Sequence, residues 1–592
     1  MKCLAFLLDG AIDQPLDLPP GHAGIVLSAT NQRYADGLID GEQTYALFAL
    51  TEQADNLAME WSRTAYAALV STSWKSAFIH RGIDLKPLVI NRLFRGFFLD
   101  RARIYLAVKR ILEAEAPQCV TIYTADDVNA RFAHAACLAA GIEPARFYLP
   151  ATRHRMRIPR ALEILMGDIA APALGSTFSK PSSSPSSPEI PHIVFIQRGS
   201  MGGKMVRGAF QALQTEHRVA ITTVRFEPED SGQEYPGVRY VDWDDYQDLG
   251  TLSPLLVYQA RVMTEGSGPA DWSDPLLCLV GPKLVRFLKH VALPSIVHTL
   301  EVTRKVIQKE HPHLLVVTDE TGLLGKAVAV QGRKWDIPTL NVQHGVRTDS
   351  PWIDDQLFDH FAVFGPSSSK VFVQRGNTPS MFVSTGSARY DRLFRREGIK
   401  PRQQVIAELG LDSSQPIVTF ASQRAWGRMT PAVKRETLLA LLRACQKSGV
   451  QIVVKLRHSQ DDYIPVEATR EPGWESVCVT ADYDLYDLLD ASAVVVTVYS
   501  TVGMEAVALG KPLLIINLTG QPDAIPYVQE GVAAGAYQPD QVGPALQLLL
   551  NTGQPSPGWA QCRQDFIRRH LTSDDGCSAE RIARLILNMI TD

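Results

Sequence analysis

The sequence predicts an α/β protein built from doubly wound parallel sheets. Short apolar runs of the kind that form buried β-strands recur along most of the 592 residues, and segments with helical apolar spacing separate them. Strands that alternate with helices favour parallel pairing, because each helix returns the chain to the start of the next strand. The alternation of strands and helices begins again after residue 395, so we expect a second doubly wound domain there. Ligands of such sheets bind outside the carboxyl ends of the strands, and functional side chains should therefore follow the strands.

Residues 1–170 are expected to form an N-terminal α/β accessory unit. Two early strands, "KCLAFLL" and "GIVLSAT", precede a long helix over residues 91–117, a strand, "CVTIYTADD", and a helix that Gly141 ends. A Ser/Pro/Gly-rich run follows over residues 171–191, and this composition is typical of a linker. We expect few contacts across the linker, and therefore independent folding of residues 191–592.

Residues 192–395 are expected to form the first doubly wound domain. Its first strand is "HIVFIQRG", followed by a glycine-rich loop and the helix "AFQALQTEH". The loop, "QRGSMGGKM", does not have the spacing of a nucleotide-binding P-loop. Two later strands, "HLLVVTDETG" and "IPTLNVQHGV", place Asp319, Glu320 and His344 at strand ends.

Residues 396–592 are expected to form the second doubly wound domain. Its strands are "PIVTFASQR", "VQIVVKLRH", "SVCVTA", "AVVVTVYS" and "PLLIIN", and all but the last end in polar residues. The strand-end candidates for ligand binding are Gln423, Arg424, Lys455, His458, Tyr499, Ser500 and Thr501.

The turn after "AVVVTVYS" carries the strongest indication of a ligand. Ser500 and Thr501 precede a helix, and a helix N-terminus offers free N–H groups and partial positive charge, which suit phosphate. Glu505 lies one turn into that helix, where a carboxylate can accept hydrogen bonds from the hydroxyls of a ribose. A simple Ser/Thr N-cap explains the turn alone equally well. Its combination with "EAVALGKP" favours nucleotide binding.

The acid pair in "TDETG" is a candidate general base. Asp319 and Glu320 lie between a strand and a helix, and a carboxylate held near a hydroxyl can accept its proton. The alternative is an N-cap aspartate followed by a first-turn glutamate, and the sequence does not separate the two. A buried, hydrogen-bonded core residue is the corresponding alternative for His344 and for His458.

Composition excludes several other classes of protein. Hydrophobic residues make up 45% and charged residues 21% of the chain, as in soluble globular proteins. A net charge of −4 gives no indication of a nucleic-acid partner. No apolar run reaches the about 18–20 residues of a membrane span, and Asp9 follows the first apolar run too soon for a signal peptide. The eight cysteines form no C-x-x-C pair, so we expect reduced, structural thiols, and no metal-ligand spacing appears.

The order of several short motifs resembles that of GT-B glycosyltransferases of bacterial surface-polysaccharide synthesis. The motifs are "QHGV", "STGSARYDRL", "FASQR", "KLRHS" and "STVGMEAVALGKPLLIIN". The layout is similar to that of CDP-glycerol glycerophosphotransferases and of capsule transferases that use CMP-linked acidic sugars of the Kdo or sialic acid type. The resemblance covers about residues 191–592. It implies two Rossmann-like domains that face a cleft, with the nucleotide donor on the second domain.

The resemblance also implies roles for individual residues. His344 would close the cleft from the first domain, and His458 would contact the nucleotide, although Ser459 stands where the family has proline. A similar acid-acid-glycine motif supplies the base in related transferases, whereas here Thr321 precedes the glycine.

We therefore predict a cytoplasmic, metal-independent glycosyltransferase without a cofactor. It would move a sugar or sugar-like group from a nucleotide-sugar donor to a carbohydrate or lipid-linked glycan acceptor in capsule or lipopolysaccharide synthesis. Arg424, Lys455 and His458 would hold the leaving phosphate. The basic run over residues 153–160 indicates possible peripheral contact with the inner membrane surface.

Two other functions remain open at this point. One is that of a UDP-N-acetylglucosamine 2-epimerase, a family similar in fold and in the "EA…LGKP" stretch, although "FASQRAWGR" lacks the histidine that this family carries there. The other is a non-catalytic nucleotide- or glycan-binding protein. Formation of a free sugar epimer without acceptor distinguishes the two enzymes, and turnover of any nucleotide-sugar excludes the binding protein.

Overall fold

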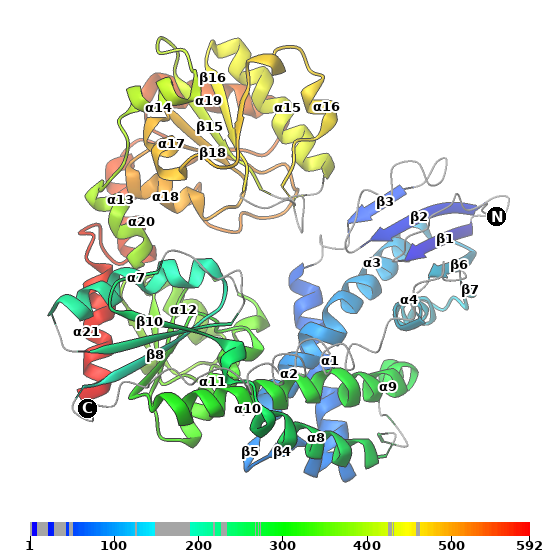
Figure 1. Cartoon of the computed structure of the whole chain (residues 1–592). Helices are drawn as coiled ribbons and strands as arrows, with labels where there is room; N and C mark the ends of the chain where they lie inside the picture. The colour runs from blue at the N-terminus through cyan, green and yellow to red at the C-terminus, as the bar shows by residue number, and fades with distance from the viewer. Residues whose placement is uncertain are drawn as a thin grey trace.

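The computed structural model describes residues 3–8, 22–28, 43–46, 51–124, 127–148, 190–216, 219–226, 234–266, 268–269, 272, 274–347, 349–423, 429, 431–457 and 462–591. These residues form three sheets of five, seven and six strands in which neighbouring strands run parallel, together with one short antiparallel pair. The predicted architecture is confirmed: two doubly wound domains of GT-B type and an N-terminal α/β unit (Figure 1).

The N-terminal sheet has the strand order β3-β2-β1-β6-β7. Its strands are β1 (Cys3–Leu8), β2 (His22–Ser28), β3 (Gln43–Ala46), β6 (Cys119–Thr124) and β7 (Ala145–Tyr148). Helices α3 (Leu99–Glu115) and α4 (Asp127–Ala139) bury their apolar residues against it. The early strands and the helix that ends at Gly141, where φ is +75°, agree with the sequence pattern.

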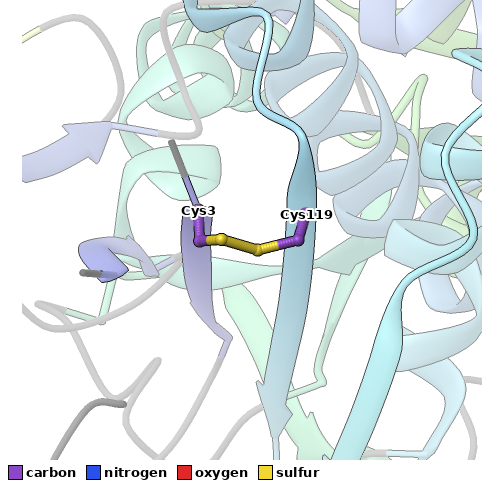
Figure 2. Close-up of a disulfide and its surroundings, with 2 residues drawn as sticks. All are labelled: Cys3 and Cys119. Carbon is purple, nitrogen blue, oxygen red and sulfur yellow. A yellow bond between two sulfur atoms is a disulfide. The ribbon is translucent and has the colours of Figure 1, made fainter. Parts of the chain in front are cut away.

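Two cysteines of this sheet are bonded to each other, so the expectation that all the cysteines are reduced thiols is wrong for this pair. Cys3 on β1 lies directly opposite Cys119 on β6, and a disulfide joins them (Figure 2). The other six cysteines are free. The pairing could not be read from the sequence, because 116 residues separate the two cysteines and only the strand register brings them together.

The N-terminal unit and the middle domain share one hydrophobic core. The expected helix over residues 91–117 is in fact α2 (Lys86–Leu93), a π-helical segment η4 (Phe94–Phe98) and α3. Side chains of α1 (Thr51–Val70), α2 and η4 are buried together with those of α8 (Leu249–Thr264), α9 (Pro275–Phe287) and α10 (Leu293–Glu310). Figure 1 shows these helices side by side. The expectation of few contacts between the two units is therefore wrong. Linker residues 171–189 lie outside the described residues.

The middle sheet has the order β10-β9-β8-β11-β12-β13-β14. Its strands are β8 (His192–Gln197), β9 (Ala220–Arg225), β10 (Val238–Asp242), β11 (Leu314–Val317), β12 (Thr339–Val342), β13 (His360–Val363) and β14 (Phe382–Ser384). Its further helices are α7 (Gly199–Glu216), α11 (Leu323–Lys334), α12 (Pro366–Gln374) and α13 (Ala388–Arg395).

The glycine-rich segment after β8 is helical, and the expectation of a loop there is wrong. Helix α7 begins at Gly199, so Gly202 and Gly203 lie in its first turns. A Cβ at Gly202 would lie 2.5 Å from the Thr318 hydroxyl oxygen, and one at Gly203 would lie 3.3 Å from the Gln197 side chain. These glycines therefore let the helix approach the strand ends closely rather than form a flexible loop.

The last domain has the strand order β17-β16-β15-β18-β19-β20. Its strands are β15 (Ile417–Ala421), β16 (Gln451–Lys455), β17 (Cys478–Thr480), β18 (Val494–Thr497), β19 (Leu513–Ile516) and β20 (Ala534–Ala536). Its helices are α14 (Arg402–Leu409), α15 (Pro431–Ser448), α16 (Val466–Thr469), α17 (Leu485–Ala491), α18 (Val502–Leu509), α19 (Val542–Thr552) and α20 (Trp559–His570).

The final helix, α21 (Ser578–Thr591), returns to the middle domain and packs beside α7 (Figure 1). The Asp391 carboxylate of α13 accepts hydrogen bonds from the backbone N–H groups of Ser578, at 3.0 Å, and Ala579, at 2.7 Å. These bonds satisfy free N–H groups at the start of α21. The last helix thus ties the end of the chain to the middle domain.

Candidate active site

Asp319, Gln423 and Tyr499 lie where the two larger sheets reverse their strand order, whereas His344 follows β12 and Lys455 ends β16. The order reverses between β8 and β11 in the middle sheet and between β15 and β18 in the last. Arg198 Nη1 donates to Asp319 Oδ2 across the first point, at 3.3 Å. The Tyr499 N–H donates to Gln423 Oε1 across the second, at 3.0 Å. Doubly wound sheets bind ligands in the crevice at such points.

Asp319 is held by the helix that follows it. Its side chain is almost fully buried, and Oδ2 accepts a hydrogen bond from the Gly325 N–H in the first turn of α11, at 3.3 Å. A Cβ at Gly322 would lie 2.0 Å from Asp319 Oδ2, and one at Gly325 would lie 1.6 Å from the Asp319 carbonyl oxygen. Both glycines are therefore needed for the loop to close around the aspartate. The N-cap residue of α11 is Gly322, so Asp319 accepts a hydrogen bond from the helix N-terminus although it lies before the N-cap position.

Glu320 forms the buried centre of a charged cluster. None of its side chain is exposed, and its carboxylate is ion-paired with the Arg347 guanidinium. His344 Nδ1 lies 3.4 Å from Glu320 Oε2 and 3.2 Å from Arg347 Nη2. The imidazole is 37% exposed, so it is the member of the cluster that a substrate can reach.

The charges around Glu320 decide its protonation. Burial alone would raise the pKa of the carboxyl group, but the charge of Arg347 and the contact with His344 lower this pKa to about 2. Glu320 is therefore a permanent anion at neutral pH and a weak proton acceptor. Such an anion can hold the His344 ring in one orientation, as a buried acid does behind a catalytic histidine.

The turn between β18 and α18 has the predicted geometry. The Ser500 hydroxyl oxygen accepts from the Val502 N–H at 3.2 Å, so Ser500 already caps the helix in part. Thr501 is the N-cap residue, and its side chain makes no capping bond. Tyr499 lies before them against Gln423, and all three residues belong to the same strand end. Arg424 and His458 lie outside the described residues, and their roles stay predictions.

A cavity of about 1150 Å³ lies between the middle and last domains. Residues of α7, α13 and α21 line one side, and Lys455 with residues 481–486 lines the other. Its basic side chains are Lys204, Arg207, Arg389, Arg392, Arg395 and Lys455, and its aromatic side chains are Tyr483 and Tyr486. Lys455 Nζ donates to the carbonyl oxygens of Leu456, at 3.2 Å, and Ala481, so this lysine also fixes the cavity wall. Burial lowers its pKa.

Glu505 is sequestered in the structure. Its side chain is fully buried, and its carboxylate is ion-paired with Arg389 of α13. Burial raises the pKa of Glu505, and the Arg389 charge opposes this effect. Arg389 Nε also donates to the Tyr486 hydroxyl at 3.0 Å. Arg389 therefore lies between Glu505 and the cavity, and its guanidinium must move before a ribose can reach the carboxylate.

The sequence interpretation missed three arginines. Arg198, Arg347 and Arg389 each lie within or next to a motif that was singled out, and each pairs with a predicted acid. The available signal was the requirement that a buried carboxylate have a cationic partner.

Comparison with known proteins identifies the family. The domain family described as CDP-Glycerol:Poly(glycerophosphate) glycerophosphotransferase matches residues 343–588. The lipid-A-disaccharide synthase of Trichlorobacter lovleyi is 30% identical over 343 residues, which cover 52% of this chain and 82% of that protein. The chain belongs to the family of this synthase. It is thus a member of a glycosyltransferase-type enzyme family.

Solved structures with a similar backbone carry related descriptions. A UDP-N-acetylglucosamine 2-epimerase of Neisseria meningitidis bound to UDP-GlcNAc is 11% identical, with a TM-score of 0.45, and covers 67% of this chain and 100% of its own. A variant of the wall teichoic acid polymerase TagF is 13% identical, with a TM-score of 0.43, and covers 68% of this chain and 89% of its own.

The described part of the chain offers neither a membrane-spanning helix nor a metal cluster. No helix there has the length and apolar content to cross a membrane. No group of three or more histidine, cysteine, aspartate or glutamate side chains in the same residues is arranged to hold a metal ion.

Proposed function

We propose that this protein transfers a sugar or sugar-like group from a nucleotide-activated donor to a carbohydrate or lipid-linked glycan acceptor in bacterial surface-polysaccharide synthesis. A CMP-linked acidic sugar is one candidate donor. The observation that carries the proposal is the cluster of His344, Glu320 and Arg347, in which a partly exposed imidazole contacts a wholly buried anion at a strand end. Membership of a glycosyltransferase-type family supports it.

His344 is the proposed general base. In the tautomer with Nδ1–H directed to Glu320, which replaces the hydrogen bond that an unprotonated Nδ1 accepts from Arg347, Nε2 carries the lone pair that accepts the proton of the acceptor hydroxyl. The acceptor oxygen forms a bond to the anomeric carbon while the bond from that carbon to the leaving phosphate oxygen breaks. Glu320 stabilises the imidazolium that results. Asp319, the other acid of the predicted pair, already accepts hydrogen bonds from Arg198 and Gly325, and these bonds hold the loop.

The donor is proposed to bind against the last domain. The cavity between the domains exceeds the usual size of small-molecule sites. Its lining combines cations that can bind phosphate groups and tyrosine rings that can stack on a base with acidic side chains that pair with some of these cations. The N-terminus of α18, with Ser500 and Thr501, provides further donors for phosphate. Gln423, Arg424, Lys455 and His458 keep their predicted donor-binding roles within this proposal.

A nucleotide screen and one substitution test the proposal. Thermal-shift assays with CMP, CDP, UDP and GDP should find one nucleotide that stabilises the protein, by about 2.7 kcal/mol at a concentration 100 times its Kd. With the corresponding nucleotide-sugar, His344→Gln should lower kcat by ~10²–10⁴-fold and leave the nucleotide Kd within a few-fold. His290→Gln, which changes a partly exposed histidine on the π-helical segment Leu288–Ala292, is the matched control.

The outcomes separate the competing functions. Full turnover by His344→Gln would reject this residue as the base. Release of a free sugar epimer without acceptor would indicate an epimerase. Nucleotide binding without turnover of any nucleotide-sugar would indicate a binding protein. Co-sedimentation with vesicles that contain anionic lipid tests the predicted membrane contact, whose basic run over residues 153–160 lies outside the described residues.

A further inference from the structure

The N-terminal unit reaches into the loop that carries the acid pair. Asn91 Nδ2 and Arg95 Nη1 both donate to the Thr321 carbonyl oxygen, each at 2.9 Å. Thr321 follows Glu320 directly and precedes the N-cap of α11. Two side-chain donors from another unit therefore converge on the peptide group next to the buried anion of the candidate site.

Arg95 is placed there by an irregularity in its helix. It lies in η4, the π-helical segment between α2 and α3. The neighbouring Gly96 packs so closely that a Cβ there would lie 2.8 Å from the Phe287 ring of α9. Single π-helical turns occur often at functional sites, because the extra residue redirects side chains.

A tryptophan that follows His344 in the sequence also contacts the Arg95 guanidinium. Its central carbon lies 4.6 Å from the centre of the Trp352 ring, within the range of a cation–π contact. Trp352 follows the segment that carries His344 and Arg347, and its Nε1 donates to Asp55 Oδ2 of α1 at 2.8 Å. The Ser350 hydroxyl donates to the same oxygen at 3.0 Å.

These contacts connect the N-terminal unit to both segments of the candidate site, the loop with the acid pair and the segment that follows His344. Asn91 and Arg95 hold the loop with Asp319 and Glu320, and Asp55 holds the segment that follows His344. All three come from the unit that the sequence marked as accessory. Figure 1 shows α2 next to α11 of the middle domain, with α1 beside α2.

We propose that Asn91 and Arg95 are positioning residues for the transfer reaction, so that the N-terminal unit is part of the acceptor-side site. This inference rests on the proposed function. Loss of both donors would free the Thr321 carbonyl group, loosen the loop and misplace Glu320 relative to His344. A displacement of about 1 Å at a catalytic group can reduce turnover by ~10²-fold.

A contact elsewhere in the same interface provides a matched control. Arg131 Nη1 of α4 donates to the Leu279 carbonyl oxygen of α9 at 2.7 Å. It is also an arginine-to-carbonyl bond between the N-terminal unit and the middle domain. A purely structural role for Arg95 predicts that Arg95→Gln and Arg131→Gln behave alike.

Hydrogen–deuterium exchange of the full-length protein tests the positioning role without any substrate. In the Asn91→Ala/Arg95→Gln variant, peptides over residues 318–326 should exchange at least about tenfold faster than in the wild type, as loss of a charge-assisted hydrogen bond implies. The Arg131→Gln variant should leave this region unchanged. The two single variants serve if the double variant does not fold. Equal exchange in the Arg95→Gln and Arg131→Gln variants would overturn the inference.

Steady-state kinetics then test whether the loop contributes to the reaction. With the donor identified by the nucleotide screen, the double variant should lose at least about tenfold in kcat while the nucleotide Kd stays within about twofold. Faster loop exchange with unchanged kcat would also overturn the inference. If the wild type turns over no nucleotide-sugar, the proposed function fails, and the exchange comparison alone supports or overturns the positioning role.

Discussion

Replacing Glu320 with glutamine tests the buried charge on which the candidate site depends. The substitution keeps the size of the side chain and removes the anion that faces Arg347 and His344. The pKa of Glu320 is lowered from 4.5 to about 2, and each pKa unit corresponds to about 1.4 kcal/mol. We therefore expect the substitution to lower the free energy of unfolding by about 3 kcal/mol at pH 7. This magnitude is similar to the cost of breaking other buried ion pairs.

The effect should depend on pH in a defined window. Between about pH 4.5 and pH 2 the unfolded chain binds a proton at Glu320 that the folded protein does not bind. The stability contributed by the carboxylate is therefore complete above the unfolded pKa and is lost as the pH falls through this window. The difference in unfolding free energy between wild type and Glu320→Gln should be constant above about pH 5.5 and should shrink below pH 4.5.

Urea denaturation followed by tryptophan fluorescence measures this difference across pH. Glu408→Gln is the matched control, because Glu408 is an exposed acid that pairs with Lys400, where water screens the charges. Glu408→Gln should lower the unfolding free energy by much less than Glu320→Gln does, because water already screens the exposed pair. A Glu320→Gln variant as stable as the wild type at pH 7, or a difference that does not change on acidification, would refute the assignment of Glu320 as a paired buried anion.

Three further predictions follow from the packing and the pairing of charges. Glu505→Ala should destabilise the protein by about 3 kcal/mol in urea denaturation, because it removes the buried carboxylate that forms an ion pair with Arg389. If Glu505 also holds ribose, the nucleotide Kd should rise by ~10- to 150-fold, and an unchanged Kd would reject that role. A fragment of residues 191–592 should aggregate or expose apolar surface to a fluorescent dye, because its α8–α10 core loses the helices that cover it; a soluble, cooperatively unfolding fragment would contradict this. Alkylation of the denatured protein, followed by mass spectrometry, should modify six cysteines without reductant and eight after reduction; eight in both cases would show that the disulfide does not form.

The sequence by itself determined the class of fold and the location of the strand ends. Apolar runs and helical spacing are local properties, so they identified β8, β11 and β12 of the middle sheet and β15 to β19 of the last sheet, whereas β10, β13, β14 and β20 were not predicted. The carboxyl ends of parallel strands share one edge of a sheet, so the position of Gln423 and Tyr499 at strand ends was enough to predict their proximity. The turn at Ser500 followed from the same local reasoning.

Only the tertiary structure decided which charges meet and which units share a core. The Arg347–Glu320 and Arg389–Glu505 pairs join residues on different elements, and nothing in the local sequence selects one arginine over another. The serine-rich linker is polar by composition, yet the helices on either side of it bury one common apolar core. The composition of a segment indicates how much apolar surface that segment can bury by itself. The surface against which it packs forms only when distant segments fold together. The sequence was therefore enough to predict that the acid pair lies at a strand end. Only the folded structure shows that Asn91 and Arg95 of the N-terminal unit bind the loop next to it.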